Sequence, residues 1–428
     1  MNILWIVNIN LPCVSKEFNL PITHTGGWIS GMSEPFINKN IQLCIVSFSD
    51  NISNKKILKK NNITYIVLKR ENTEIDEMLS IQKIYEEFSP DIVHIHGTEN
   101  RHSLSALKAS KNNNVVISIQ GLTSVYAKHF FSDIPIYYSL IYKIKSSIFK
   151  LLKIETNLIF DQYLYFLESS KREIEMLSSS KYVIGRTTWD RDNTSKINSS
   201  LVYFKCNETL RNEFYNEEKW DISNMEPYTI FSTQGHYPIK GFHILLKALR
   251  IVKRKYPYFK LYTSGHNTCI NLKNTMNDRI LRIVTEYDSY IATLIKKYKL
   301  SNNIFYLGSM SEQDIKLRLL KSNVFVLQSS IENSPNSLCE AMKVGVPIIT
   351  TDVGGIKDII SYEEGTLIDF GDVKALAQSI INTFDHPELS IAKSKKALLH
   401  SQITHDKETN FNNLIKIYEE IIEREKHE

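Results

Sequence analysis

The sequence predicts two α/β domains in tandem, each a doubly wound parallel sheet covered by helices. The chain has 428 residues, which is more than one hydrophobic core usually holds, so two domains are expected. Short apolar segments alternate with longer helical patterns along most of the chain, as they do in sheets of this class. The alternation breaks between about residues 126 and 181, where a long aromatic and basic helical stretch is expected.

The individual strands are expected where short apolar runs end at polar or glycine-containing turns. Ile3–Val7 is apolar on both faces, which fits a strand buried on both sides. The other expected strands are Gln42–Phe48, Ile63–Leu68, Ile92–Ile95, Val115–Ile119, Tyr182–Gly185, Thr229–Ser232, Phe259–Ser264, Ile304–Leu307, Val324–Leu327, Pro347–Thr350 and Thr366–Ile368. The longer expected helices are Phe242–Tyr256, Asp278–Tyr298, Glu312–Leu320 and the amphipathic Asn410–Lys426.

These elements suggest a first domain of residues 1–206, a polar linker of residues 207–227, a second domain of residues 228–403 and a C-terminal amphipathic helix over 404–428. The stretch from 126 to 181 is predicted to be a helical insertion in the first domain. Lys143, Lys145, Lys150 and Lys153 lie there among apolar residues. The stretch therefore either packs on the sheet or touches a membrane or a lipid-linked acceptor.

Composition excludes several classes of protein. Hydrophobic residues make up 42% and charged residues 23%, as in ordinary globular proteins, and the net charge of +5 comes without a long basic block. Nucleic acid is therefore not an expected partner. The five cysteines are scattered without a CxxC pair, which favours a reducing compartment. The N-terminus lacks a basic region and no run reaches the ~18 apolar residues of a membrane span, so a cytoplasmic location is expected, with peripheral membrane contact left open.

The segment from Val324 to Ile360 carries the strongest chemical signal, because Glu332 and Glu340 flank a turn between a strand and a short helix. Ser334 is a suitable N-cap, Pro335 suits the first helical position, and Gly345 suits the position past the helix end.

The spacing within this helix assigns its faces. Leu338, Ala341 and Met342 share the face expected in the core, whereas Asn336 and Glu340 share the open face. The N–H groups of a first helical turn bind anions, and carboxylates accept hydrogen bonds from hydroxyl groups. Together they suggest a nucleotide-sugar, although two glutamates at this spacing also occur as solvated charges at a helix end.

Glycine turns supply two further candidates. Gly235 precedes Lys240 and Gly241, where a cation at a helix start could meet a phosphate; an ordinary lysine at a helix start is the alternative. Gly26 and Gly27 follow the first strand and would let the backbone approach a ligand, or they form a simple tight turn.

In this order, these pieces resemble glycosyltransferase family 4, whose members are retaining enzymes of the GT-B fold. The matching features are Gly26-Gly27, DIVHIHG at Asp91–Gly97, Lys240-Gly241, and the block from Glu332 to Gly355. The resemblance implies two Rossmann-like domains that face a central cleft, the first binding the acceptor and the second the nucleotide-sugar. Segments such as ISIQGLTSVYAKHFF also look like a bacterial subgroup that builds capsular or O-antigen polysaccharides.

The resemblance implies a role for each matched residue. Glu340 would bind the ribose, Glu332 the donor sugar, and Lys240 the leaving diphosphate. The implied donor-binding residues are Gly26, Gly27, Arg186, Gly235, Lys240, Gly308, Met310, Glu332, Asn336, Ser337, Leu338 and Glu340. The implied catalytic residues are Glu332, Lys240 and His96, and the acceptor-side residues are Thr98, Glu99 and Gln120.

Two positions depart from the family pattern. His236 stands where the family usually has an arginine, so the diphosphate would meet fewer cations unless Arg186 supplies one. Gln120 stands where a catalytic-site histidine is usual, and a neutral amide cannot act as an acid or a base. His96 is a candidate substitute, with a purely structural histidine as the alternative, and His94 is expected to be buried in its strand.

The expected function is retaining transfer of a hexose from a nucleotide-sugar, expected to be a UDP-sugar, to a saccharide or polyprenyl-linked acceptor in surface polysaccharide biosynthesis. Electrostatic stabilisation of the departing diphosphate would drive the reaction. No DxD motif occurs in a suitable turn, so neither a metal nor another cofactor is expected. A GT-B-fold sugar-nucleotide epimerase and a non-catalytic sugar-nucleotide-binding subunit are the alternatives.

Overall fold

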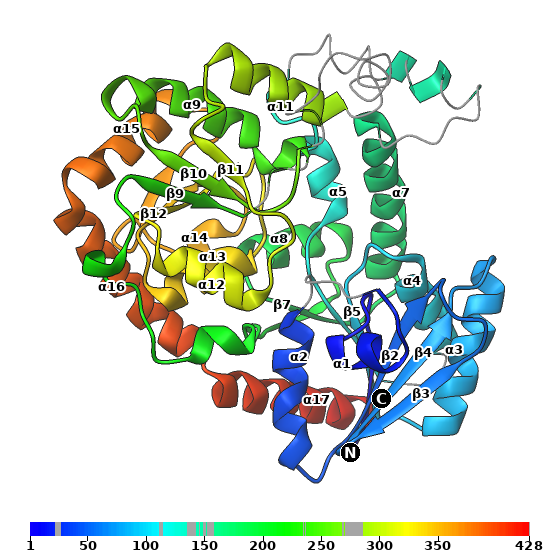
Figure 1. The fold of residues 1–428 in the computed structure, drawn as a ribbon. Helices are drawn as coiled ribbons and strands as arrows, with labels where there is room; N and C mark the ends of the chain where they lie inside the picture. Colours follow the sequence, from blue (N-terminus) through cyan, green and yellow to red (C-terminus); the bar gives the residue numbers. More distant parts are fainter. Residues whose placement is uncertain are drawn as a thin grey trace. The chain divides into compact units, whose positions relative to one another are not determined.

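The computed structural model describes residues 1–21, 27–110, 114–134, 143–144, 146–148, 151, 158–233, 235, 237–267, 269 and 286–427. The chain divides into two compact units. The first unit comprises Met1–Ser124, Glu168–Asn212 and Ile403–Glu428, and the second comprises Val125–Leu167 and Glu213–Gln402. Each unit contains one sheet (Figure 1).

The described part of the first unit contains an eight-stranded sheet in the order β3-β4-β2-β1-β5-β6-β7-β8. Its pairs are parallel except for β3 with β4, which are antiparallel. The strands are β1 (Asn2–Ile6), β2 (Gln42–Ser49), β3 (Lys56–Lys60), β4 (Ile63–Lys69), β5 (Ile92–His96), β6 (Val115–Ser118), β7 (Tyr182–Gly185) and β8 (Val202–Lys205). From β1 the strands are added on one side of the sheet, and from β5 onward they are added on the other side. The pair of β1 and β5 is therefore the topological switch point.

Helices cover both faces of this sheet. They include α1 (Pro12–Glu17), α2 (Gly27–Ser33), α3 (Glu74–Phe88), α4 (Arg101–Ala109), α8 (Thr188–Ile197) and α17 (Lys407–Lys426). Helix α17 buries Phe411, Leu414 and Tyr418 in the same core as Trp5 of β1. The Trp5 indole nitrogen donates to the Tyr418 hydroxyl at 3.0 Å, so the C-terminal helix is an integral part of this core.

The described part of the second unit contains a six-stranded parallel sheet in the order β11-β10-β9-β12-β13-β14. Its strands are β9 (Thr229–Ser232), β10 (Lys260–Thr263), β11 (Ile304–Tyr306), β12 (Val324–Leu327), β13 (Ile348–Thr351) and β14 (Thr366–Ile368). Its helices include α9 (Phe242–Lys255), α11 (Glu286–Lys297), α12 (Glu312–Leu320), α13 (Asn336–Val344), α14 (Ile356–Ile359), α15 (Val373–Asp385) and α16 (Pro387–Thr404). Here the topological switch point lies between β9 and β12.

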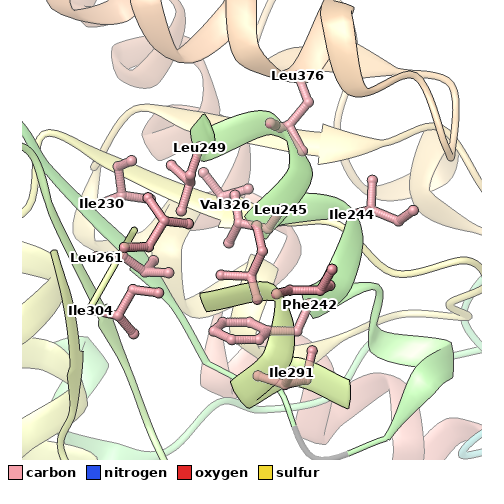
Figure 2. Packing of buried hydrophobic residues seen from close by; sticks show 14 of the residues in the cluster. Ile230, Phe242, Ile244, Leu245, Leu249, Leu261, Ile291, Ile304, Val326 and Leu376 are labelled. Carbon is pink, nitrogen blue, oxygen red and sulfur yellow. The ribbon is translucent and has the colours of Figure 1, made fainter. Parts of the chain in front are cut away.

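Helix α9 supplies the centre of the second core. Figure 2 shows Phe242, Leu245 and Leu249 of this helix directed toward strand residues such as Ile230 and Val326. The first turn of the helix is buried all round, from Phe242 to Leu246, and Ala248, Leu249 and Val252 continue the buried face. Burial of this face fixes the start of α9, and therefore the turn that precedes it.

Every strand predicted from the sequence is present, with ends that agree to within one residue. The edge strands β3 and β8 were not predicted. The predicted helix Asp278–Tyr298 is seen as α11, since residues 278–285 lie outside the described part of the chain. Helix α17 begins at Lys407, earlier than predicted, because the Asp406 side chain caps it by accepting from the Thr409 amide at 2.8 Å.

The division into units differs from the predicted domain boundaries. Residues 125–167 group with the second unit, not the first. The physical reason is that Phe130, Ile134 and Ile159 are buried in the core built around α9. Residues 403–428 group with the first unit because α17 completes its core.

Candidate functional site

The site begins at the switch point of the second sheet, where β9 and β12 pair in parallel. Parallel neighbours end at the same edge of a sheet, so the loops after Ser232 and Leu327 lie together. The first loop leads into a short 3₁₀ helix, Pro238–Lys240, and the second leads to α13. These two loops carry Lys240 and Glu332.

Lys240 and Glu332 form a short ion pair, with 2.6 Å between Nζ and Oε1. The Ser329 hydroxyl donates to the same carboxylate oxygen at 2.6 Å. The two charged side chains are only 14% and 6% exposed. Burial alone would lower the pKa of Lys240, but the charge of Glu332 outweighs it and holds that pKa above its ordinary value. A fixed cation therefore lies at the edge of the sheet where β9 and β12 have their carboxyl ends.

Two glycines hold the loops close together. Gly241 has φ of +65°, and a Cβ there would lie 2.0 Å from the carbonyl oxygen of Gln328. The Gln328 amide in turn donates to the Lys240 carbonyl at 2.8 Å. On the other side, a Cβ on Gly354 would lie 1.9 Å from the Glu332 carbonyl oxygen. Any side chain at either glycine would push Lys240 or Glu332 out of place.

Helix α13 begins one residue later than predicted. Pro335 has an extended ψ of 118° and occupies the N-cap, so Asn336 is the first helical residue. Pro335 is therefore not at the first helical position, and Ser334 is not the N-cap. Gly345 ends the helix in the left-handed conformation, with φ of +85°, as predicted.

The faces of α13 agree with the prediction in part. Leu338, Ala341 and Met342 are buried. Asn336 and Ser337 are half-buried on the first turn. The prediction that Glu340 lies on an open face is wrong, because this residue is only 3% exposed. A buried carboxylate in the second turn of a helix that starts at the sheet edge is a candidate for recognising a buried polar group.

Sequence reasoning missed the residues that support the Glu332 loop. Gln328 and Ser329 belong to the loop itself, whereas Tyr126 comes from a segment far away in the sequence. The Tyr126 hydroxyl accepts a hydrogen bond from the Asn333 amide at 2.9 Å, and the Ser330 hydroxyl donates to the His129 carbonyl at 3.3 Å. No local sequence signal could have identified these contacts.

The other predicted donor-binding residues of the second unit lie at separate places in the structure. Gly308 has φ of +73° and pairs with Gly265 through two backbone hydrogen bonds. Met310 lines a surface pocket of about 410 Å³ with Leu307 and Leu317. Gly235 lies against the Phe242 ring. His236 and Gly26 lie outside the described residues.

In the first unit, Gly27 begins α2 at a point where a Cβ would lie 2.7 Å from the Arg211 Cδ atom. Arg186 is 5% exposed, and one of its terminal nitrogens is 2.8 Å from the Glu208 carboxylate. The other donates to the carbonyls of Ile119 and Gln120, at 3.3 and 3.1 Å. Arg186 is therefore engaged in a buried ion pair within this unit.

His96 is 1% exposed and packs between the rings of Trp5, Trp28 and His94. Neither of its ring nitrogens has a hydrogen-bond partner in the described part of the chain. Burial lowers the pKa of His96 to about 3, so the ring is neutral and a weak base. His94 is buried, as predicted, and bonds Tyr418 at 2.6 Å and Ser118 at 2.5 Å.

The acceptor-side candidates lie at the carboxyl ends of β5 and β6. Thr98 is buried and donates to Glu173 at 3.0 Å. Glu99 is half-buried and accepts from Asn8, which follows β1, at 2.9 Å. The amide nitrogen of Gln120 is buried without a partner among the described residues. Asn8 and Glu99 thus meet across the switch point of the first sheet.

The described residues lack two features, a helix that could span a membrane and a cluster of metal ligands. No helix among them combines the length and the apolar character that crossing a bilayer requires. Within the same residues, no group of three or more histidine, cysteine or acidic side chains could hold a metal ion.

Comparison with known proteins gives two domain matches. Residues 20–154 match the family model described as glycosyl transferase 4-like, and residues 214–398 match the model described as glycosyl transferases group 1.

Curated relatives match over part of their length. The capsular polysaccharide biosynthesis glycosyltransferase CapM of Staphylococcus aureus is 29% identical over 142 residues, which are 33% of this chain and 32% of CapM. The amylovoran biosynthesis glycosyltransferase AmsK of Erwinia amylovora is 24% identical over 163 residues, 36% of each chain. The chain thus spans less than half the length of the curated relatives it matches.

A solved structure extends the likeness to the whole chain. HepE of Anabaena, in complex with UDP and glucose, is 14% identical, with a TM-score of 0.67 over 97% of this chain and 98% of HepE. This likeness concerns the fold, and it agrees with the GT-B fold predicted from the sequence. The chain therefore carries a glycosyl transferase 4-like domain followed by a glycosyl transferases group 1 domain, on two Rossmann-like units.

Proposed function

We propose that this protein is a retaining glycosyltransferase that moves a hexose from a UDP-sugar to a saccharide or polyprenyl-linked saccharide. The observation that carries the proposal is the buried Lys240–Glu332 pair at the switch point of the second sheet, 2.6 Å apart. Ligands of open parallel sheets bind outside the carboxyl ends of the strands at this point. A cation and a carboxylate fixed there match a ligand with a diphosphate and a hydroxyl-rich sugar.

Each residue has a separate part in the proposed reaction. The bond between the sugar C1 and the diphosphate oxygen breaks, and a bond from C1 to the acceptor oxygen forms on the same face. The proton of the acceptor hydroxyl passes to the departing diphosphate. Lys240 and the first turn of α13 stabilise the negative charge that develops on the diphosphate. Glu332 accepts hydrogen bonds from the donor sugar, and the buried Glu340 accepts them from the ribose.

The choice of substrate rests on the relatives. HepE is described as bound to UDP and glucose, which supports a UDP-sugar donor. The names of CapM and AmsK support a place in polysaccharide biosynthesis. The reaction is proposed to occur in the cytoplasm without a metal ion, with the protein soluble or peripherally bound to the membrane.

Incubation with UDP-glucose, with and without methyl glycosides as acceptors, tests this proposal. Release of UDP, with an α-linked product when an acceptor is present, supports retaining transfer. Conversion of the UDP-sugar to an isomer without any acceptor would point to an epimerase instead. UDP binding without hydrolysis, transfer or isomerisation would point to a non-catalytic binding subunit.

Two variants assign the roles. We expect Glu340→Ala to weaken UDP binding, and Glu332→Ala mainly to lower turnover. Calorimetry with UDP and a UDP-release assay separate the two effects. Equal turnover by Glu332→Ala and the wild type would contradict the assignment.

A further inference from the structure

A short segment from the first third of the chain lies against the loop that carries Glu332. Residues 126–134 group with the second unit, and we call them the strap. The Tyr126 hydroxyl accepts a hydrogen bond from the backbone amide of Asn333 at 2.9 Å. The carbonyl of the same peptide group, that of Glu332, accepts from the Gly355 amide at 3.0 Å. The peptide group between Glu332 and Asn333 is therefore held at both of its polar atoms.

The strap is anchored at further points of the same unit. The hydroxyls of Ser132 and Ser330 are 2.5 Å apart, and the Ser330 hydroxyl also donates to the His129 carbonyl at 3.3 Å. The Ser132 carbonyl accepts a hydrogen bond from the Nε2 atom of His243 at 2.8 Å. His243 belongs to the first turn of α9. The strap thus joins the Glu332 loop to the start of α9.

The anchored end of the strap has an unusual backbone. Ser132 and Asp133 have φ of +42° and +60°, left-handed values that residues other than glycine rarely adopt. Such a conformation persists where the surroundings hold it in place. Here the hydrogen bonds of Ser132 and the burial of Phe130 in the core around α9 do so. The strap is therefore a fixed support for the loop that it contacts.

The strap also lies near the cation of the ion pair. Burial lowers the pKa of Lys240 and the charge of Glu332 raises it, and Tyr237 and Tyr126 raise it further. The Tyr126 phenol is thus close to Lys240 as well as bonded beside Glu332. Its position is that of a residue of the site, although no pattern in the sequence marks it.

We infer that Tyr126 is a positioning residue of the proposed transfer reaction, which orients the Glu332 carboxylate toward the donor sugar through the peptide group that joins Glu332 to Asn333. This inference rests on the proposed function, because it explains how a residue of that site is held. Small displacements of a group that meets the reacting sugar lower turnover strongly. Lys240 and the first turn of α13 bind the diphosphate in this proposal, and they do not depend on the Tyr126 hydroxyl. Tyr126 therefore affects turnover more than UDP affinity.

Tyr126→Phe tests the inference, because it removes the hydroxyl and keeps the ring. With UDP-glucose and methyl α-glucoside as probes, kcat for UDP release should fall about tenfold, whereas the Kd for UDP, measured by calorimetry, should change less than about twofold. Tyr262→Phe is the matched control. The Tyr262 hydroxyl donates to Glu226 at 3.1 Å, so this variant also loses one hydrogen bond of the second unit, but not one to the Glu332 loop. It should keep the kcat of the wild type.

Hydrogen exchange followed by NMR measures the positioning without any turnover. In Tyr126→Phe the Asn333 amide should exchange about tenfold faster, relative to the amides of α9, because it has lost this hydrogen bond. Tyr262→Phe should leave that rate unchanged. Ser330→Ala removes another anchor of the strap and should lower kcat by a smaller factor than Tyr126→Phe does.

The outcomes separate the inference from the proposed function. A wild-type kcat in Tyr126→Phe, an equal loss of kcat in Tyr262→Phe, or an unchanged exchange rate at Asn333 would overturn the inference and leave the proposed function standing. A loss of UDP affinity as large as the loss of kcat would also overturn it, because Tyr126 would then act on the nucleotide. A wild type that neither binds UDP nor releases it from UDP-glucose would instead count against the proposed function.

Discussion

Breaking the Lys240–Glu332 pair should destabilise the second unit strongly. At 2.6 Å and an effective dielectric constant of about 20, the gross attraction is about 6 kcal/mol. Desolvation of both groups offsets much of it, yet removing one partner leaves the other charged and buried, which costs about 3–5 kcal/mol. We therefore expect Lys240→Met and Glu332→Gln each to lower the free energy of unfolding by about 3 kcal/mol or more. The double variant should lose less than the worse of the two, because it leaves no charge unpaired.

Hydrogen exchange is the suitable assay, because the two units need not unfold together. Amides of α9 and β12 report on the second unit, and those of β1 and β5 serve as an internal control in the first. UDP binding by calorimetry is measured alongside. Lys240→Met should weaken UDP binding by about tenfold to a hundredfold, the range expected for a charged hydrogen bond, whereas Glu332→Gln should change it much less.

Additive effects of the two substitutions would refute the reasoning, because they would mean that the two side chains do not interact energetically. A Lys240→Met protein that binds UDP as the wild type does would leave the ion pair as a structural feature only. In that case the diphosphate would have to be bound elsewhere.

Three further predictions concern stability and catalysis. His94, His96 and His102 of the first unit have pKa values lowered by burial, to about 3 for the last two. Below pH ~6.5 the unfolded chain therefore binds more protons than the folded chain. Each histidine should lower the free energy of unfolding by about 1.4 kcal/mol per pH unit as the pH falls further. Urea unfolding between pH 7 and pH 5 checks this, and a free energy of unfolding that does not change with pH would contradict it. Gly241→Ala should lower the melting temperature more than Gly371→Ala does. Both glycines have positive φ, but of the two only Gly241 faces a backbone oxygen. Thermal denaturation compares the variants, and equal losses would refute the steric argument. Sugar transfer from UDP-glucose should continue in excess EDTA, and loss of activity that Mg²⁺ or Mn²⁺ restores would show that a metal is required.

The sequence predicted every strand except β3 and β8, which form the two edges of the first sheet. Strands buried on both sides are continuous apolar runs, such as Val324–Leu327, and these stand out against polar turns. Strand β3 has the sequence KILKK and is largely exposed, and β8 is half-buried. Lysines protect an exposed edge from pairing with other chains, but they also remove the apolar pattern by which a strand is recognised.

The sequence could predict only those parts of the site that follow from the order of the predicted strands. Lys240 and Glu332 are 92 residues apart in the sequence, but each follows a predicted strand that adjoins the switch point. The contacts of Arg186 could not be inferred, because its partner Glu208 follows the unpredicted strand β8. The support that Tyr126 gives to the Glu332 loop depends on residues 125–167 belonging to the second unit, which the order of the elements alone does not reveal.

The burial of the Lys240–Glu332 pair is itself an argument for function. Well-packed apolar residues of similar volume usually stabilise a fold as well as a buried ion pair does, so stability alone does not account for two charges at this position. Two close glycine contacts, at Gly241 and Gly354, are also needed to hold the loops that carry them. These features occur together at the switch point, where a bound diphosphate would give Lys240 a second negative partner and leave Glu332 to accept sugar hydroxyls. We therefore propose that the two charges are placed at this point because they bind a ligand.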